Sequence, residues 1–357
     1  MAKKFIKSFF IMISFLLLLC VFLVVLFDPF FQYHKPLPGL KAVLTDKEYQ
    51  CVGSLKNFDY DSVIAGSSVS ENYNNRWFDE GFDCVSIKAI RSYGATADLC
   101  FLLDVAFKNH TIKYVFYNLD PSALCADPIT TFESTGCPIY LYDDNYFNDI
   151  EYLLNKDVLF EKIPYLIAQS LIGDYDEGNS YNWAQWKNFN SDMILGLYIR
   201  KLSINEMKEA DYYQEQLDGN IDLLISEIES HPETVFKICI PPYSMLWWDN
   251  IYRNGDTESY LYNMEIAMEK LLTYDNVELY YFLNDREIVT NLENYMDILH
   301  FSPEINHYIC DSMIEESHKI TKENYRQVME DSHNFSYEVV NELIKPYEDR
   351  IIVDIYE

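Results

Sequence analysis

The segment Val63-Ile64-Ala65-Gly66-Ser67-Ser68, residues 63–68, decides most about the fold of this chain. A short apolar run that leads into a glycine and two serines predicts a buried β-strand followed by a small-residue turn. In an open parallel sheet such a turn lies at the carboxyl ends of the strands, where these sheets bind ligands. Serine is also a common helix N-cap, so Ser67, Ser68 or Ser70 can instead be a capping residue.

Further short runs rich in β-branched or aromatic residues predict the other strands, so that strands are expected at 62–65, 84–87, 113–119, 235–240 and 277–282. Apolar residues recur with a helical period at 97–108, 220–230, 258–272 and 303–318. Strands that alternate with helices predict parallel βαβ units and a sheet that is covered on both faces. We therefore expect an α/β protein, a three-layer α/β/α sandwich. Near the end of the chain, 323–345 predicts more helix and 351–356 predicts a terminal edge strand.

Residues 5–27 form an almost uninterrupted apolar run, long enough for the about 20 helical residues that cross the hydrocarbon core of a membrane. Lys3 and Lys4 precede this run and Lys7 lies near its start, and positive charge favours the cytoplasmic side. The sequence thus predicts a single-pass protein of the cell membrane, with a cytoplasmic N-terminus and the rest of the chain outside. A cleaved signal peptide is the alternative, but its apolar region is about 7–15 residues long and ends at small residues, which segment 24–29 lacks.

Two parts follow from this interpretation, an N-terminal membrane anchor at 1–34 and an extracytoplasmic domain at 35–357. A long insertion, at about 121–233, separates the third and fourth predicted strands, and much of it has helical patterning and many tyrosines. This length exceeds a simple crossover. The insertion is expected either to form a cap beside the carboxyl ends of the strands or to stiffen the domain as a helical decoration.

The formal net charge of −30 limits the classes of partner. Binding to nucleic-acid phosphates requires Lys and Arg to replace counterions, so we expect no nucleic-acid partner. The chain contains no P-loop and no His-Glu-x-x-His zinc motif, and its 11 glycines are few for a dinucleotide-binding loop. We expect no metal and no cofactor.

Seven of the eight cysteines lie outside the apolar run, and no two of them have the close Cys-x-x-Cys spacing of a zinc or redox site. Only Cys125 and Cys137 flank a loop short enough to suggest a disulfide. The alternative is that the cysteines pack as small apolar side chains.

A carboxylate precedes a histidine by three residues in the segment Asp297-Ile298-Leu299-His300-Phe301-Ser302. Residues three apart in one turn point to the same side, so Asp297 can orient the His300 imidazole. Together with a serine, this pair suffices for acyl transfer through a serine ester. A surface salt bridge is the alternative interpretation.

Three segments, in this order, resemble the blocks of the SGNH/GDSL hydrolase superfamily: Ala65-Gly66-Ser67-Ser68, Ser92-Tyr93-Gly94-Ala95-Thr96 and Asp297-Ile298-Leu299-His300-Phe301-Ser302. The chain resembles more closely the membrane-anchored SGNH-like proteins of Gram-positive bacteria, in which Gly-Ser-Ser replaces the more familiar Gly-Asp-Ser. Segments 138–143 and 152–156 are also similar to that subgroup. The resemblance implies an SGNH-like fold with a parallel, flavodoxin-like sheet.

The resemblance implies a role for each site residue. Ser68 would be the nucleophile, His300 the general base and then the general acid, and Asp297 the carboxylate that orients the imidazole. The backbone N–H groups of Ser68 and Gly94 would form the oxyanion hole, with the side chain of Asn118 as a third donor.

The chain departs from the superfamily in two places. Ser67 occupies the position of the aspartate in the first block. The Gly-x-Asn-Asp block expected after the third strand is absent, and the chain reads Tyr-Asn-Leu-Asp-Pro at 117–121. These departures leave open a slow, a specialised or an inactive enzyme.

The function that the resemblance implies is that of a serine esterase or O-acyltransferase, which acts through an acyl-serine on acyl esters, acetyl esters foremost, of cell-envelope glycans. Its partners would be an acylated glycan or another small ester, the membrane, and a membrane acyltransferase as acyl donor. The alternative is a non-catalytic SGNH-like scaffold that binds envelope glycan or a membrane partner. Trp183, Trp186, Trp247 and Trp248 would either stack on sugars or pack in the core.

Overall fold

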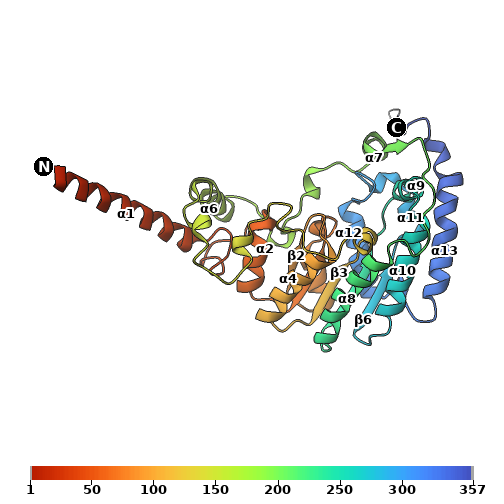
Figure 1. The fold of residues 1–357 in the computed structure, drawn as a ribbon, viewed down its shortest axis with the longest axis horizontal. Helices are drawn as coiled ribbons and strands as arrows, with labels where there is room; N and C mark the ends of the chain where they lie inside the picture. The colour runs from red at the N-terminus through yellow and green to blue at the C-terminus, as the bar shows by residue number, and fades with distance from the viewer. Residues whose placement is uncertain (1, 355–357) are drawn as a thin grey trace. The chain divides into compact units, whose positions relative to one another are not determined.

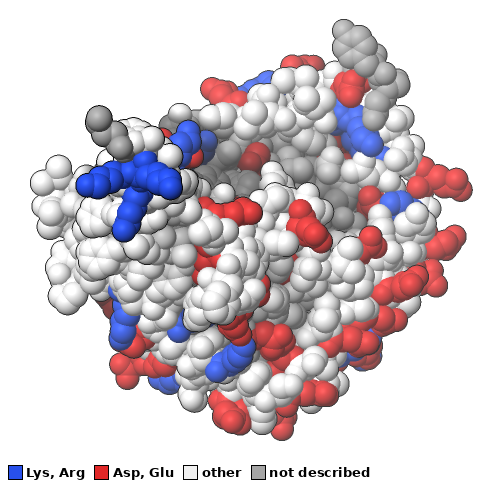
Figure 2. Space-filling view, turned by 60° about the vertical axis from the view of Figure 1, so that its left-hand side comes forward, with Lys and Arg blue, Asp and Glu red and all other residues white. Residues whose placement is uncertain are grey.

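The computed structural model describes residues 2–354, which divide into two compact units. Unit 1 comprises residues up to 59 together with 132–181, and unit 2 comprises 60–131 together with the chain from 182 onward. Figure 1 shows the course of the chain, and Figure 2 shows one face on which acidic side chains far outnumber basic ones.

Unit 2 is built around a six-stranded sheet with the order β2-β1-β3-β5-β6-β7. Its strands are β1 (Ser62–Gly66), β2 (Ser86–Ile90), β3 (Tyr114–Asn118), β5 (Val235–Ile240), β6 (Val277–Tyr281) and β7 (Lys319–Ile320). The first five are parallel, and β7 pairs antiparallel with β6. Numbered among themselves, the parallel strands have the order 2-1-3-4-5, which is the flavodoxin-like order. The prediction of an α/β protein with a mostly parallel central sheet is confirmed.

Helices cover both faces of this sheet, and every residue of β1 is accordingly buried. On one side α3 (Asn75–Phe82) packs against α12 (Pro303–Glu315). A second row consists of α4 (Thr96–Asn109), α8 (Gln214–Ser230), α10 (Thr257–Leu271) and α13 (Tyr325–Glu338), each in contact with the next. The helices expected at 97–108, 220–230 and 258–272 correspond to α4, α8 and α10. The helix expected at 303–318 ends earlier, because Glu316 adopts a left-handed conformation with φ 56°.

Shorter elements complete unit 2. They are η1 (Ser70–Asn72), η2 (Pro121–Cys125), η6 (Ala184–Trp186), α7 (Ser191–Leu197), α9 (Met245–Arg253), α11 (Arg286–Val289), η7 (Leu292–Asn294), η8 (Val339–Leu343) and η9 (Lys345–Tyr347). The strand β8 (Ile352–Asp354) pairs in parallel with β4 (Ile199–Lys201) in a separate two-stranded sheet. The terminal strand expected at 351–356 is therefore present in part, and 355–356 lie outside the described residues.

Unit 1 contains α1 (Ala2–Phe27), which is long and apolar enough to cross a membrane. Its other elements are α2 (Lys47–Asn57), η3 (Ile139–Leu141), α5 (Ile150–Leu153), the π-helix η4 (Val158–Lys162), α6 (Ile163–Leu171) and η5 (Glu177–Asn179). A small core joins Val24 and Phe30 to side chains from 141–163. The middle of the insertion thus packs with the N-terminal segment, and the flanking parts of the insertion belong to unit 2.

The structure shows how the tryptophans and cysteines with two alternative roles are packed. Trp247 and Trp248 are buried, as core packing requires, whereas Trp186 is exposed. No disulfide occurs within residues 2–354, and Cys125 and Cys137 are thiols.

Gly66, the last residue of β1, lies where a larger side chain does not fit. A Cβ at this position would lie 2.8 Å from Asn118 Cβ and closer still to Ser70 Oγ. We therefore predict that Gly66→Ala lowers the free energy of unfolding by about 1–3 kcal/mol, the usual cost of overpacking. Urea unfolding of the full-length protein in detergent measures this loss.

Gly196 provides the matched control, because it lies in α7 and a Cβ there would have no neighbour within 4 Å. Gly196→Ala should leave stability unchanged or raise it by up to about 1 kcal/mol, since alanine is the better helix former. Equal losses in the two variants would mean that the crowding at Gly66 is not the cause.

Candidate active site

The turn that follows β1 presents two serines at the carboxyl edge of the sheet. β1 lies between β2 and β3, with Ala65 opposite both Ala89 and Tyr117. After Gly66 the chain bends at once, and the Ser70 N–H donates to the Ser67 carbonyl at 3.0 Å as η1 begins. Ser67 is buried and Ser68 is half-buried, so the second serine is the one that faces outward.

The hydroxyl of Ser68 meets His300 across the sheet edge. Ser68 Oγ lies 2.8 Å from His300 Nε2, and His300 Nδ1 lies 2.7 Å from Asp297 Oδ2. The fold therefore brings together the three residues expected to act as nucleophile, base and orienting carboxylate. The arrangement has the serine–histidine–carboxylate connectivity used in acyl transfer.

A tight loop fixes the positions of Asp297 and His300 relative to each other. Tyr295 and Phe301 form an antiparallel bridge that closes the loop. Within it, Asp297 Oδ1 accepts the backbone N–H groups of Leu299 and His300, both at 2.9 Å, as a short polar side chain does in an Asx turn. The spacing of three residues in the sequence is thus the spacing of one turn.

Hydrogen bonds keep the Asp297 carboxylate ionised. Burial alone would raise the pKa of Asp297, but the hydrogen bonds and the charge of His300 outweigh burial and hold this pKa below its ordinary value. An ionised Asp297 favours the imidazole tautomer with hydrogen on Nδ1, which leaves Nε2 free to take the Ser68 proton.

The two serines open into a cavity of about 410 Å³ in unit 2. The residues that line it include Ser67, Ser68, Gly94, Asp120 and His300, with Val69, Ala95 and Ile129 among the apolar ones. Part of the wall comes from the beginning of the insertion, where the Thr131 hydroxyl and backbone N–H both donate to Asp98 at 2.6 Å.

Asp120 is a second carboxylate in this cavity, and sequence reasoning assigned it no role. It accepts a hydrogen bond from the Tyr243 hydroxyl and one from Asn118 Nδ2 at 3.3 Å. Burial raises the pKa of Asp120, whereas hydrogen bonds from Ser67 and Tyr243 and the charge of His300 act in the opposite direction. Asp120 follows the end of β3 and lies beside Ser67 in the lining of the cavity.

The side chain of Trp183 packs against the His300 ring. Its indole lies edge-to-face against the His300 ring, with 4.9 Å between the ring centroids. Asn72 Oδ1, at the end of η1, accepts the backbone N–H groups of Trp183 and Ala184 at 3.3 and 3.1 Å. This tryptophan is therefore fixed to the segment that carries the serines, a contact that no spacing in the sequence indicates.

The three expected oxyanion donors differ in geometry. The Ser68 N–H makes no hydrogen bond within residues 2–354, so it is available to a ligand. The Gly94 N–H donates to the Arg91 carbonyl at 3.0 Å. Asn118 Nδ2 points to Asp120, and Asn118 is not among the residues that line the cavity. The roles of Gly94 and Asn118 stay predictions.

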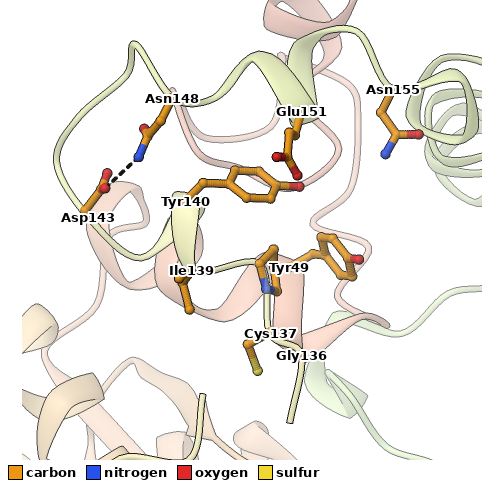
Figure 3. Close-up of a pocket in the computed structure, with 10 residues that line it drawn as sticks. Tyr49, Gly136, Cys137, Ile139, Tyr140, Asp143, Asn148, Glu151 and Asn155 are labelled. Carbon is orange, nitrogen blue, oxygen red and sulfur yellow. Dashed lines mark hydrogen bonds between the residues drawn. The ribbon is translucent and has the colours of Figure 1, made fainter. Parts of the chain in front are cut away.

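Unit 1 has a separate cavity of about 600 Å³, drawn in Figure 3. Tyr49, Tyr140 and Glu151 lie around it, and Asn148 donates to Asp143 at 2.7 Å. Its lining residues, all of them described, include no serine and no histidine. The hydrogen-bonded serine–histidine pair lies in the unit 2 cavity.

No protein-family model matches the chain, and no curated protein is significantly similar to it.

We predict that a fluorophosphonate probe labels the full-length protein and that Ser68→Ala abolishes the labelling, because Ser68 Oγ lies within hydrogen-bond distance of the base His300. Gel fluorescence measures the labelling. Ser122→Ala is the matched control, since Ser122 is an exposed serine in the lining of the same cavity. Labelling that survives in Ser68→Ala and disappears in Ser122→Ala would place the reactive serine elsewhere in the cavity.

Tyr243→Phe tests the buried Asp120. Because the pKa of Asp120 is raised, the folded protein binds this proton more tightly than the unfolded chain does. The free energy of unfolding therefore falls as the pH rises from the pKa of Asp120 in the unfolded chain to its pKa in the folded protein. Removal of the Tyr243 hydroxyl raises the pKa further. We therefore predict a larger fall in melting temperature at pH 8 than at pH 4, with a loss of about 1–3 kcal/mol at the higher pH.

Tyr295→Phe is the control for this prediction. Tyr295 is equally buried, but its hydroxyl donates to the neutral Pro242 carbonyl at 2.7 Å. Its loss of stability should therefore vary little with pH. The same pH dependence in both variants would contradict the role of the Asp120 charge.

Proposed function

We propose that this protein is a membrane-anchored serine esterase or O-acyltransferase of the SGNH type, which acts on acyl esters, acetyl esters foremost, of cell-envelope glycans. The observation that carries the proposal is the hydrogen-bonded series from Ser68 through His300 to Asp297 at the wall of a cavity. The flavodoxin-like order of the parallel strands and the order of the three sequence blocks support the SGNH assignment.

The chemistry begins with a proton transfer. His300 Nε2 takes the hydroxyl proton as Ser68 Oγ attacks the carbonyl carbon of the ester, and the resulting imidazolium is stabilised by Asp297. The tetrahedral oxyanion is stabilised by the Ser68 N–H. Collapse of this intermediate breaks the bond to the leaving alcohol, which receives the proton from His300, and the acyl group stays on Ser68.

The second half of the reaction decides between hydrolysis and transfer. His300 takes a proton from water or from a sugar hydroxyl, that oxygen attacks the acyl-serine, and Ser68 leaves with the proton. Water gives an esterase, and a sugar hydroxyl gives an O-acyltransferase. In the second case a membrane acyltransferase would supply the acyl donor.

The cavity suits a small acyl group. Val69, Ala95 and Ile129 supply apolar lining for it. Tyr93 is 93% exposed at the same cavity, where its ring is free to stack on a sugar face. The N-terminal helix and the lysines in its first two turns favour a location outside the cell membrane for the site, near envelope glycans.

Asp297→Asn tests the proposal by kinetics. We predict that kcat for hydrolysis of an aryl acetate falls by about 10³–10⁴-fold, because asparagine favours the wrong imidazole tautomer while the fold is kept. Colorimetric release of the phenol measures the rate, and release of acetate from O-acetylated envelope glycan measures the natural reaction. A matched control is Asp311→Asn, a half-exposed carboxylate on α12 beside His307.

The contrary outcome is equally definite. Folded wild-type protein that neither reacts with a fluorophosphonate nor releases an acyl group, alone or with an acyl donor, would favour the non-catalytic scaffold. Binding of deacylated envelope glycan by the same protein would then be the function to measure.

A further inference from the structure

Unit 1 covers only the last part of the membrane helix. Val24 is buried against Tyr152, Val158 and Ile163, whereas most of the preceding side chains of α1 are exposed. Counted from Phe5, where the apolar run begins, Val24 is about the twentieth residue, and about 20 helical residues cross a hydrocarbon core. The elements that touch Val24 therefore lie at the level of the lipid headgroups.

The exit of the chain from α1 is held tightly. The buried Asp28 carboxylate accepts the backbone N–H groups of 32–34 at 2.7–3.0 Å and the Tyr152 hydroxyl at 2.8 Å. His34 Nε2 lies 2.8 Å from the Val25 carbonyl, which has no partner further along the helix. The direction of α1 thus decides which side of unit 1 faces the bilayer.

The helix α6 lies beside this end of α1. The π-helix η4 contacts α1 and continues directly into α6, and Figure 1 shows α6 next to the C-terminal end of α1. Residues 163–172, Ile-Pro-Tyr-Leu-Ile-Ala-Gln-Ser-Leu-Ile, contain no charged side chain. A helix that is uncharged all round is typical of a protein core or of contact with lipid.

Only one side of α6 is covered by protein. Ile163 and Leu166 are buried in unit 1. The opposite side, here named the α6 face, is exposed and consists of Phe160, Pro164, Tyr165, Ala168, Leu171 and Ile172. Positions 164, 168, 171 and 172 recur at the intervals that define one side of a helix. Phe160, Leu171 and Ile172 are 74%, 66% and 88% exposed.

We propose that the α6 face lies in the headgroup and acyl-chain boundary of the same bilayer that α1 crosses. Apolar helices that lie in this boundary bury their face about 5–10 Å into it. A lipid surface is the occupant because the six side chains of the face are uncharged, with the exposed Glu161 beside them just before α6, and because the face belongs to the unit that packs around the end of the membrane helix. The proposal rests on α1 crossing a membrane and does not depend on ester chemistry.

Two contacts with the bilayer would give unit 1 a fixed orientation. A single helix leaves an attached unit free to rotate about the helix axis and to tilt. A second apolar face, held to the same helix by the packing of Val158 and Ile163 with Val24, removes that freedom. Unit 1 then keeps one orientation relative to the membrane surface.

Photolabelling from the lipid tests this inference. The full-length protein is reconstituted in liposomes of phosphatidylglycerol and phosphatidylcholine that carry a diazirine on an acyl chain near the headgroup, and mass spectrometry locates the adducts after irradiation. We expect adducts in α1 and in 160–172, several-fold above those at Val85, an apolar side chain of unit 2 that is 54% exposed.

The paired substitution Leu171→Asp with Ile172→Asp should lower the adducts in 160–172 several-fold and leave those in α1 unchanged. Leu197→Asp with Ile199→Asp is the matched control, since both residues are exposed apolar side chains of unit 2. Wild-type adducts confined to α1 would overturn the proposal. So would a dimer in detergent that the 171/172 pair converts to a monomer, because a second copy would then cover the face.

Discussion

The close approach of β1, η1 and β3 at Gly66 is the constraint on which the candidate site depends. Without a Cβ at this position, Ser70 and the Asn118 side chain come directly against the end of the strand. The chain can therefore turn at once and lift Ser68 over the sheet edge, within 2.8 Å of His300 Nε2. A wider turn would place the hydroxyl elsewhere, and the loop that carries His300 would have no partner.

The same edge holds a buried carboxylate, and this gives the site an unusual electrostatic balance. Asp120 favours a positive charge on His300, which forms when the serine loses its proton. It also disfavours a negative charge on a substrate oxygen in the same cavity. Tyr243, Asn118 and Ser67 offset part of the cost of burying it, so that the hydrogen bonds around Asp120 set how far each effect acts.

Much of the fold is readable from the sequence because its strands and helices have clear periods. The strands β1, β3, β5 and β6 and the helices α4, α8 and α10 lie where apolar spacing predicts them, whereas β2, expected at 84–87, spans Ser86–Ile90. The insertion is different. Its apolar residues show that it packs, but not against what, and the structure divides it between the two units, with 132–181 in the unit that contains the N-terminal helix α1.

The sequence by itself determined the parallel α/β architecture, the apolar N-terminal helix and the pairing of Asp297 with His300, because periodicity and local spacing depend on neighbouring residues. Only the tertiary structure decided that Ser68 reaches His300, that Asp120 and Trp183 join them, and that α6 leaves one apolar side uncovered. These contacts join residues far apart in the chain. Their geometry follows from how strands and loops pack, which no local pattern records.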